Sequence, residues 1–332
     1  MPEAHGRHRP SSDGRGRWLA ALMAAYTPAL QAACGQERGD ATPVAVAEAH
    51  GTVSVDLAVV GMDPNDREVT VQTLTRRFQA LRSERVISAV IRPSVDSLRL
   101  NLKVRIAPDC SRAVGLALAE TLTTIATARG ALGVHILPSS STGPGVLSRL
   151  RGQAGADVTL EARRDNPFIY TVRGAMGRLH EARQRLHGWS PTAGLSVIAG
   201  PMDDAQTTVY LIRSRPDLES DAVAELEQAD KGLYLNLTPA GRDRLREWLH
   251  GNPPPVGLVR LDDRVLQATP LSSHDPDRLH LLANALPGGP AALRAILDQP
   301  PLPQALRLTA RRVTCQDRMG AIAWSVSSAS GP

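Results

Sequence analysis

The segment from Leu98 to Ile106 alternates apolar and polar residues without a break. Leucine, valine or isoleucine occupies every second position, and Arg99, Asn101, Lys103 and Arg105 lie between them. Because successive side chains of a strand point to opposite faces of a sheet, this pattern predicts a half-buried β-strand. The outward basic residues indicate either a solvated face or a seam that a helix covers.

The elements on both sides of this strand predict a mixed fold. Their order is strand, helix, strand, strand, helix, strand, which is the split βαβ, or ferredoxin-like, arrangement. The neighbouring elements are a strand at 53–60, a helix at 71–81, a strand at 86–91, a helix at 111–128 and a closing strand at 134–137. We therefore predict an α+β chain with a ferredoxin-like domain over residues 52–137.

Beyond this domain, Ser, Gly and Pro are enriched in residues 138–156, which predicts a linker or long loop. Residues 157–212 read as a further α+β segment, and the helix within it carries apolar residues from Met176 to Leu186. The last predicted domain spans residues 213–326.

The most distinctive local pattern begins at Gly232. Leucines alternate up to Leu237, and Thr238 followed by Pro239 is a favourable helix start. After this helix, two apolar runs at 256–261 and 265–269 predict a hairpin. Another helix is expected from Asp275, with Leu279, Leu282 and Leu286 on one face, ending at Pro287, Gly288 and Gly289.

This part of the chain resembles the head of the large periplasmic domain of the SecD protein-export membrane protein family. In that family a strand ends in Leu-Thr, a helix with an early glycine follows, and a hairpin then closes at a proline. The matching residues here are Thr238, Gly241, Leu261, Asp262, Val265 and Pro270. Residues 217–229 and 279–287 resemble the flanking segments, and the 52–137 unit is similar to the base of the same domain.

The resemblance implies a surface that contacts unfolded or translocating polypeptide. Asp263 replaces the hairpin glycine of the family, and the glycine-rich segment after Pro270 is shortened here. The sequence has no counterparts of the family's downstream transmembrane helices and their charged residues, so ion transport is not implied.

The amino terminus resembles an export signal. Four arginines precede an apolar stretch from Trp18 to Ala33, which is shorter than the roughly 20 residues of a bilayer span. Cys34 follows two alanines, as in a bacterial lipoprotein processing site, although Gln31 departs from that pattern. We expect a signal peptide over 1–33, lipidation of Cys34 and a tether over 34–51. A disordered cytoplasmic leader with an unrelated cysteine is the alternative.

Export would affect the two other cysteines. In an oxidising compartment Cys110 and Cys315 can pair, and a bridge that closes about 200 residues could contribute about 4–5 kcal/mol. Two buried free thiols are the alternative. Removal of the leader would also lower the formal net charge from +5 to +3, since it carries four arginines and two acids.

Candidate catalytic groups are few, and we expect neither an enzyme nor a cofactor or metal. Asp262 and Asp263 suit a turn, Asp275 suits a helix cap, and Gly288 and Gly289 lack a phosphate-loop context. A metal cluster could be drawn around His274 with Asp275 and Asp277, or from His180 and His187, but no further ligand motif accompanies them.

Aromatic residues make up only 3% of the chain, and the central strand has none on which a base could stack, so nucleic acid is not the expected partner. The sequence instead predicts an exported, lipid-anchored, non-enzymatic protein of the bacterial envelope. Its expected partners are unfolded or translocating polypeptide, or envelope and Sec components. The alternative is a structural or assembly lipoprotein without an export role.

Overall fold

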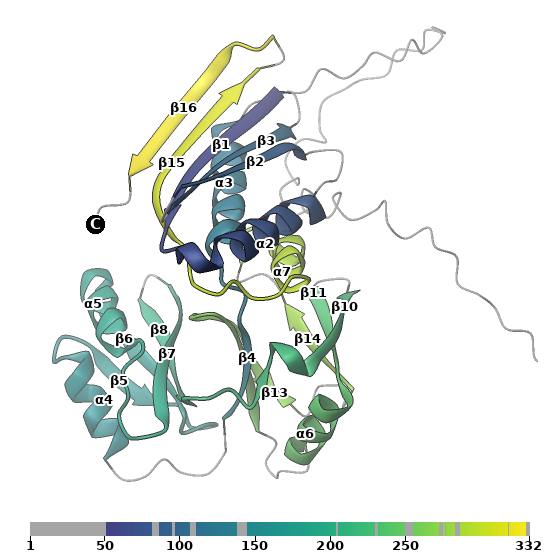
Figure 1. The fold of residues 1–332 in the computed structure, drawn as a ribbon. Coiled ribbons are helices and arrows are strands. Elements are labelled where there is room, and N and C mark those ends of the chain that lie inside the picture. The colour runs from purple at the N-terminus through teal and green to yellow at the C-terminus, as the bar shows by residue number, and fades with distance from the viewer. Residues whose placement is uncertain are drawn as a thin grey trace, which may run out of the picture.

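The protein folds into helices and antiparallel sheets (Figure 1). The computed structural model describes residues 51–81, 86–94, 97–106, 111–137, 145–203, 205–229, 232–249, 255–271, 275, 277–282, 286–317 and 319–329. Within these residues, six α-helices and sixteen strands confirm the α+β class.

The helices are α2 (Arg67–Ala80), α3 (Arg112–Thr127), α4 (Val146–Ala154), α5 (Met176–Leu186), α6 (Pro239–Leu249) and α7 (Gly289–Leu297). The first eight strands are β1 (Gly51–Val60), β2 (Val86–Pro93), β3 (Ser97–Ile106), β4 (Leu132–Leu137), β5 (Thr159–Ala162), β6 (Ile169–Arg173), β7 (Leu195–Met202) and β8 (Gln206–Arg213). The others are β9 (Leu218–Glu219), β10 (Val223–Ala229), β11 (Gly232–Leu237), β12 (Val256–Leu261), β13 (Arg264–Pro270), β14 (Arg278–Leu282), β15 (Arg307–Gln316) and β16 (Ile322–Ala329).

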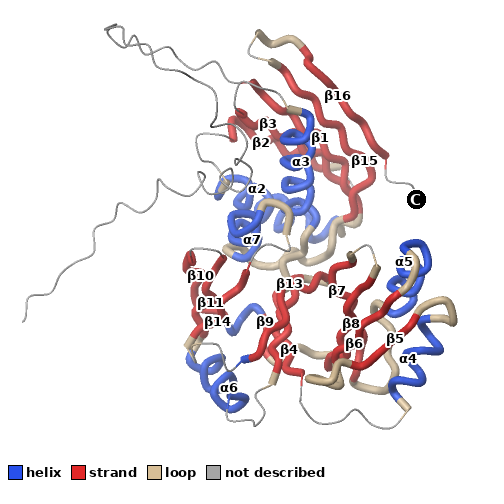
Figure 2. Tube along the Cα trace, turned by 180° about the vertical axis from the view of Figure 1, so that it is seen from behind, coloured by secondary structure: helices blue, strands red, loops and turns tan. Residues whose placement is uncertain are grey.

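The largest sheet has five strands in the order β16-β15-β1-β3-β2. The alternation that predicts β3 also sets its faces: Leu98, Leu100 and Leu102 are buried, whereas Arg99 and Lys103 are exposed. β1 alternates in the same way and is paired in register with β3. Helices α2 and α3 pack on the buried face, so the outward arginines lie on a solvated face (Figure 2).

The closing strand of this sheet differs from the prediction. β4 does not join it; β15, from the far end of the chain, lies beside β1 instead. The reason is that β4 is buried on both faces, which its mainly apolar sequence allows, and pairs with β12 from Val256↔Leu137 to Leu261↔Leu132. The predicted hairpin therefore pairs, through β12, with the strand that was expected to close the first domain.

A single hydrophobic core joins the five-stranded sheet to the regions that follow. It runs from Val53 and Leu100 through α3 and α7 to Leu235 and Leu281 in the three-stranded sheet β10-β11-β14. A second core, around Tyr170 and Leu179, fills the space between the sheet β5-β6-β8-β7 and helices α4 and α5. α4 occupies the second half of the segment that was predicted as a linker, so that prediction is wrong for 146–154.

The helix expected from Asp275 is also wrong. Residues 278–282 form β14, in which Leu279 and Leu281 are buried and paired with Leu235 and Leu233 of β11. Alternation with a period of two prevails over the helical spacing because β11 offers an open edge. Gly288 and Gly289 begin α7 rather than end a helix, and both have positive φ, of 83° and 58°.

Candidate interaction site

The tip of the β12–β13 hairpin is fastened to the chain that connects α3 to β4. The Asp262 carboxylate accepts hydrogen bonds from the backbone N–H groups of Gly130, at 3.0 Å, and Ala131, at 2.9 Å. The Asp262 N–H donates in return to the Ala131 carbonyl at 2.8 Å. Asp262 has a φ of 55°, a left-handed conformation that aspartate tolerates better than most residues. Hairpin geometry and these backbone hydrogen bonds thus explain why an aspartate occupies position 262.

Arg77 holds the other side of the same connection. Its side chain is 0% exposed, and its guanidinium donates to the carbonyls of Ile125, at 3.1 Å, Ala128, and Arg129, at 2.8 Å. These carbonyls belong to the end of α3 and the residues after it, which have no partners within the helix. Burial lowers the Arg77 pKa to about 10, and the charge of Asp262 opposes this shift.

Arg260 of β12 and His135 of β4 form a further pair close to this connection. The Arg260 side chain donates through Nε to His135 Nε2 at 2.9 Å and through its terminal nitrogen to the Asp262 carbonyl at 2.7 Å. His135 is 0% exposed, and burial, with the neighbouring Arg260 charge, lowers its pKa to about 4. His135 is therefore neutral near pH 7 and acts as a hydrogen-bond acceptor.

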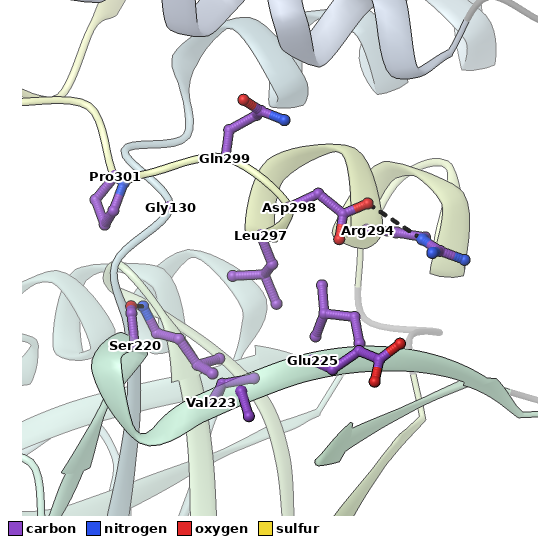
Figure 3. A pocket seen from close by; sticks show the side chains of 12 residues that line it. Gly130, Ser220, Val223, Glu225, Arg294, Leu297, Asp298, Gln299 and Pro301 are labelled. Atoms are coloured by element: carbon purple, nitrogen blue, oxygen red, sulfur yellow. Dashed lines mark hydrogen bonds and ion pairs between the residues drawn. The ribbon is translucent and has the colours of Figure 1, made fainter. Parts of the chain in front are cut away.

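Gly130 also lines a cavity of about 290 Å³ between α7, β10 and the start of β4 (Figure 3). Its charged groups are Glu225 and the Arg294–Asp298 ion pair, whose atoms are 3.2 Å apart. The hydroxyl of Ser220 already accepts a hydrogen bond from the Leu132 N–H at 3.0 Å. The remaining lining is Leu132, Val223, Ala224, Leu226, Leu297, Gln299 and Pro301. This mixture suits contact with a side chain of a partner better than acid–base chemistry.

The six residues of the SecD-like motif do not form one site. Thr238 caps α6, since its hydroxyl accepts from the Gly241 N–H at 3.3 Å. Gly241 allows α6 to approach the preceding chain, where an added Cβ would lie 2.9 Å from the Ala222 carbonyl. Leu261, Val265 and Pro270 belong to a different sheet, β13-β12-β4-β9, and Asp262 lies in the turn between β12 and β13.

The histidines considered as metal ligands have other partners. His180 lies on α5 with its Nε2 2.9 Å from the Gln184 side chain, and His187 accepts from the Ala199 N–H at 3.2 Å. Burial lowers the pKa of His187. Asp275 accepts from the Asp277 N–H at 3.0 Å, while His274 lies outside the described residues. Across the part of the chain that the structure describes, no group of three potential ligands could hold a metal ion.

Lipidation of Cys34 and pairing of Cys110 with Cys315 stay predictions. Cys34 and Cys110 lie outside the described residues, and Cys315 is fully buried in β15 opposite Val53. None of the described helices combines the length and apolar character that a bilayer crossing needs.

Among solved structures, the chain is similar to two SecDF structures. One neighbour is the crystal structure of SecDF in the super-membrane-facing form, with a TM-score of 0.41 and 15% identity. The match covers 81% of this chain and 31% of that chain, so this chain spans under a third of its length. A structure of a membrane component SecDF that enhances protein export has a TM-score of 0.38 and 17% identity. That match covers 77% of this chain and 97% of the SecDF chain. No family model and no curated protein sequence matches the chain.

Proposed function

We propose that this chain is a non-enzymatic protein of the bacterial envelope that binds polypeptide or envelope partners and takes part in protein export. The observation that supports this proposal is the sequence pattern at 232–270, which resembles the SecD head. Its strand, capped helix and hairpin occur as β11, α6 and β12–β13.

Two surfaces of the protein support a role in binding a partner. The face of the five-stranded sheet opposite α2 and α3 is solvated and basic, and the cavity beside Gly130 opens next to β10. The basic face is formed by strands of one sheet, and the cavity is lined by α7, β10 and the chain segments beside them. The second candidate, a structural or assembly lipoprotein, would use the same surfaces for a folded envelope partner.

Crosslinking in the cell separates these two candidates. A secretory polypeptide stalled during translocation should form a covalent adduct with the full chain, and loss of the chain should slow secretion. Absence of that adduct, with unchanged secretion, would favour the assembly role.

We also propose that export and anchoring proceed through the leader at 1–33 and lipidation of Cys34. The resemblance of the amino terminus to a lipoprotein signal supports this proposal. Growth with a clickable fatty acid should label the wild-type chain and not the Cys34→Ala variant. Equal labelling of both would end the proposal.

A bridge between Cys110 and Cys315 is proposed on the same basis of export. The burial of Cys315 and the packing of α3 on β15 support it, since α3 begins two residues after Cys110. Peptide mapping of the exported chain under non-reducing conditions should recover the linked pair. Recovery of both thiols in free form would contradict it.

A further inference from the structure

β16 forms one edge of the five-stranded sheet. It pairs with β15 from Ala310↔Ala329 to Gln316↔Ile322, and within the described residues no strand lies on its other side (Figure 1). An eight-residue edge strand directs roughly half of its backbone N–H and C=O groups away from its neighbour. Such a row of groups can pair with another extended chain.

The other sheet edges in the described part of the chain carry charge or proline or are short. β2 carries a register shift together with Arg92 and Pro93, and β10 carries Glu225 and Glu227. The remaining edge strands are short or contain a charge or proline, namely β5, β7, β9, β13 and β14. β16 has neither charge nor proline in its sequence IAWSVSSA. A register shift lies at its start, between Ile322 and Trp324, whereas Trp324–Ala329 pair with β15 without interruption. This part of β16 therefore lacks charge and proline, two of the usual devices that prevent pairing at an edge.

The two faces of β16 differ in chemistry. Trp324 and Val326 stand opposite Cys315 and Val313, on the face that packs against the helices. Ser325 and Ser327 are on the opposite, solvated face. A strand added beside β16 would continue this alternation, since side chains that are neighbours across strands share a face.

The solvated face attracts negative charge. Arg312 lies on it opposite Ser327, and the register places four further basic side chains of β2 and β3 on the same face. They are Arg92, Arg99, Lys103 and Arg105. Asp56 is the acidic side chain that β1 contributes to this face, and it accepts a hydrogen bond from Asn101. Acidic residues of an added strand would face this basic surface.

We propose that β16 receives an extended segment of the bound polypeptide as an added strand, and that it prefers segments in which apolar and acidic residues alternate. This inference rests on the proposed function and specifies where and how the polypeptide is held. The apolar residues extend the helix-packed face beside Trp324 and Val326, and the acidic residues lie toward Arg312.

The first test uses fluorescent peptides of eight residues, the length of β16, titrated with the full chain by anisotropy. A peptide of alternating Val and Glu should bind saturably. A peptide with the same four valines followed by four glutamates should bind about tenfold more weakly, because it cannot place apolar and acidic side chains on opposite faces. Equal binding of both would overturn the proposal.

Backbone pairing is tested without altering the protein. Two versions of the alternating peptide carry N-methyl groups on either the valines or the glutamates, so that each version blocks one edge of the peptide. The edge that faces β16 should matter, and methylation there should weaken binding about tenfold through lost hydrogen bonds. Unchanged binding of both versions would show that the strand edge is not used.

The charge preference is tested with Arg312→Glu and a matched control, Arg164→Glu, which makes the same charge change at an exposed residue before β6. Arg312→Glu should weaken the Val/Glu peptide several-fold and strengthen a Val/Lys peptide, and Arg164→Glu should do neither. Equal effects of the two variants would overturn the assignment of the acidic residues to this face.

Location is tested with a benzophenone on the alternating peptide, followed by mass spectrometry. Crosslinks should fall in 322–329, and crosslinks confined to other segments would overturn the proposal while leaving polypeptide binding intact. A dimer in light scattering whose β16 is protected from crosslinking would show that a second copy occupies this edge. Failure of the chain to capture any polypeptide would refute both the proposed function and this inference.

Discussion

Replacement of Asp262 by Ala tests how the hairpin is fixed to the rest of the molecule. The change removes a charged acceptor from the Gly130 and Ala131 N–H groups and places alanine at a φ of 55°. A hydrogen bond to a charged group contributes about 1.5–3 kcal/mol, and a left-handed alanine costs about 1 kcal/mol. The free energy of unfolding should therefore fall by about 4 kcal/mol for Asp262→Ala.

Two further variants separate these causes. Asp262→Gly keeps the favourable φ and loses only the acceptor, so it should cost about 3 kcal/mol, and Asp262→Asn, which keeps one acceptor oxygen, about 1–2 kcal/mol. The matched control is Asp263→Ala in the same turn, where the carboxylate is 86% exposed and 3.8 Å from Arg260. It should cost under about 0.5 kcal/mol. Urea unfolding followed by circular dichroism measures all four, and equal losses for Asp262→Ala and Asp263→Ala would refute the reasoning.

Three other predictions concern Arg77, His135 and two glycines. Arg77→Met should lower the free energy of unfolding by about 3 kcal/mol or more, because three backbone carbonyls lose their donor. Arg76→Ala, at the exposed neighbouring residue, should change the free energy of unfolding little. Similar urea midpoints for the two variants would contradict this. His135 has a pKa lowered to about 4, so its contribution to stability is complete above its unfolded value near 6.5 and is lost as the pH falls through about 4. Wild-type stability should therefore fall more steeply than that of His135→Gln over this window, and parallel pH profiles would count against it. Gly232→Ala should strongly destabilise the chain, since the added Cβ would lie 1.8 Å from the Leu281 carbonyl. Gly152→Ala in α4, where the added Cβ meets open space, should stabilise the chain by about 0.5–1 kcal/mol. Thermal melts of both variants check this contrast.

Local periodicity was sufficient for most elements. The strict alternation around Leu100 predicts both β3 and its buried face, and the Thr238–Pro239 start predicts α6. Both patterns are local and do not depend on distant partners. The same reasoning fails at Leu279, where spacing allowed a helix and pairing with β11 decided for a strand.

Long-range pairing accounts for the remaining differences. Nothing within residues 52–137 indicates that β4 leaves the first sheet for β12, or that β15 takes the place beside β1. We propose that the ferredoxin-like unit consists of β1, α2, β2, β3 and α3 completed by β15, with the rest of the chain inserted before that strand. The first core then combines residues up to Ile136 with residues from Leu218 onward, whereas the stretch from Leu137 to Ile212 builds most of the second core.

The candidate site shows the same limit. Asp262 was identified from its pattern, but its bonds to Gly130 and Ala131 require two segments that are far apart in the sequence. Arg77 could have been found from the sequence, since it lies three residues after Leu74 and four before Leu81 on the predicted apolar face of the helix. His135 and Arg260 meet only through the pairing of β4 with β12.

Site-specific crosslinking in the cell tests the central claim, polypeptide binding, most directly. A photo-reactive residue placed at Ser327 in β16, with Arg164 as the control position, is activated while a secretory polypeptide is stalled in translocation. We expect an adduct between the chain and that polypeptide from Ser327 and little from Arg164. Absence of any adduct at surface positions across the molecule, together with unchanged secretion when the chain is deleted, would contradict the claim.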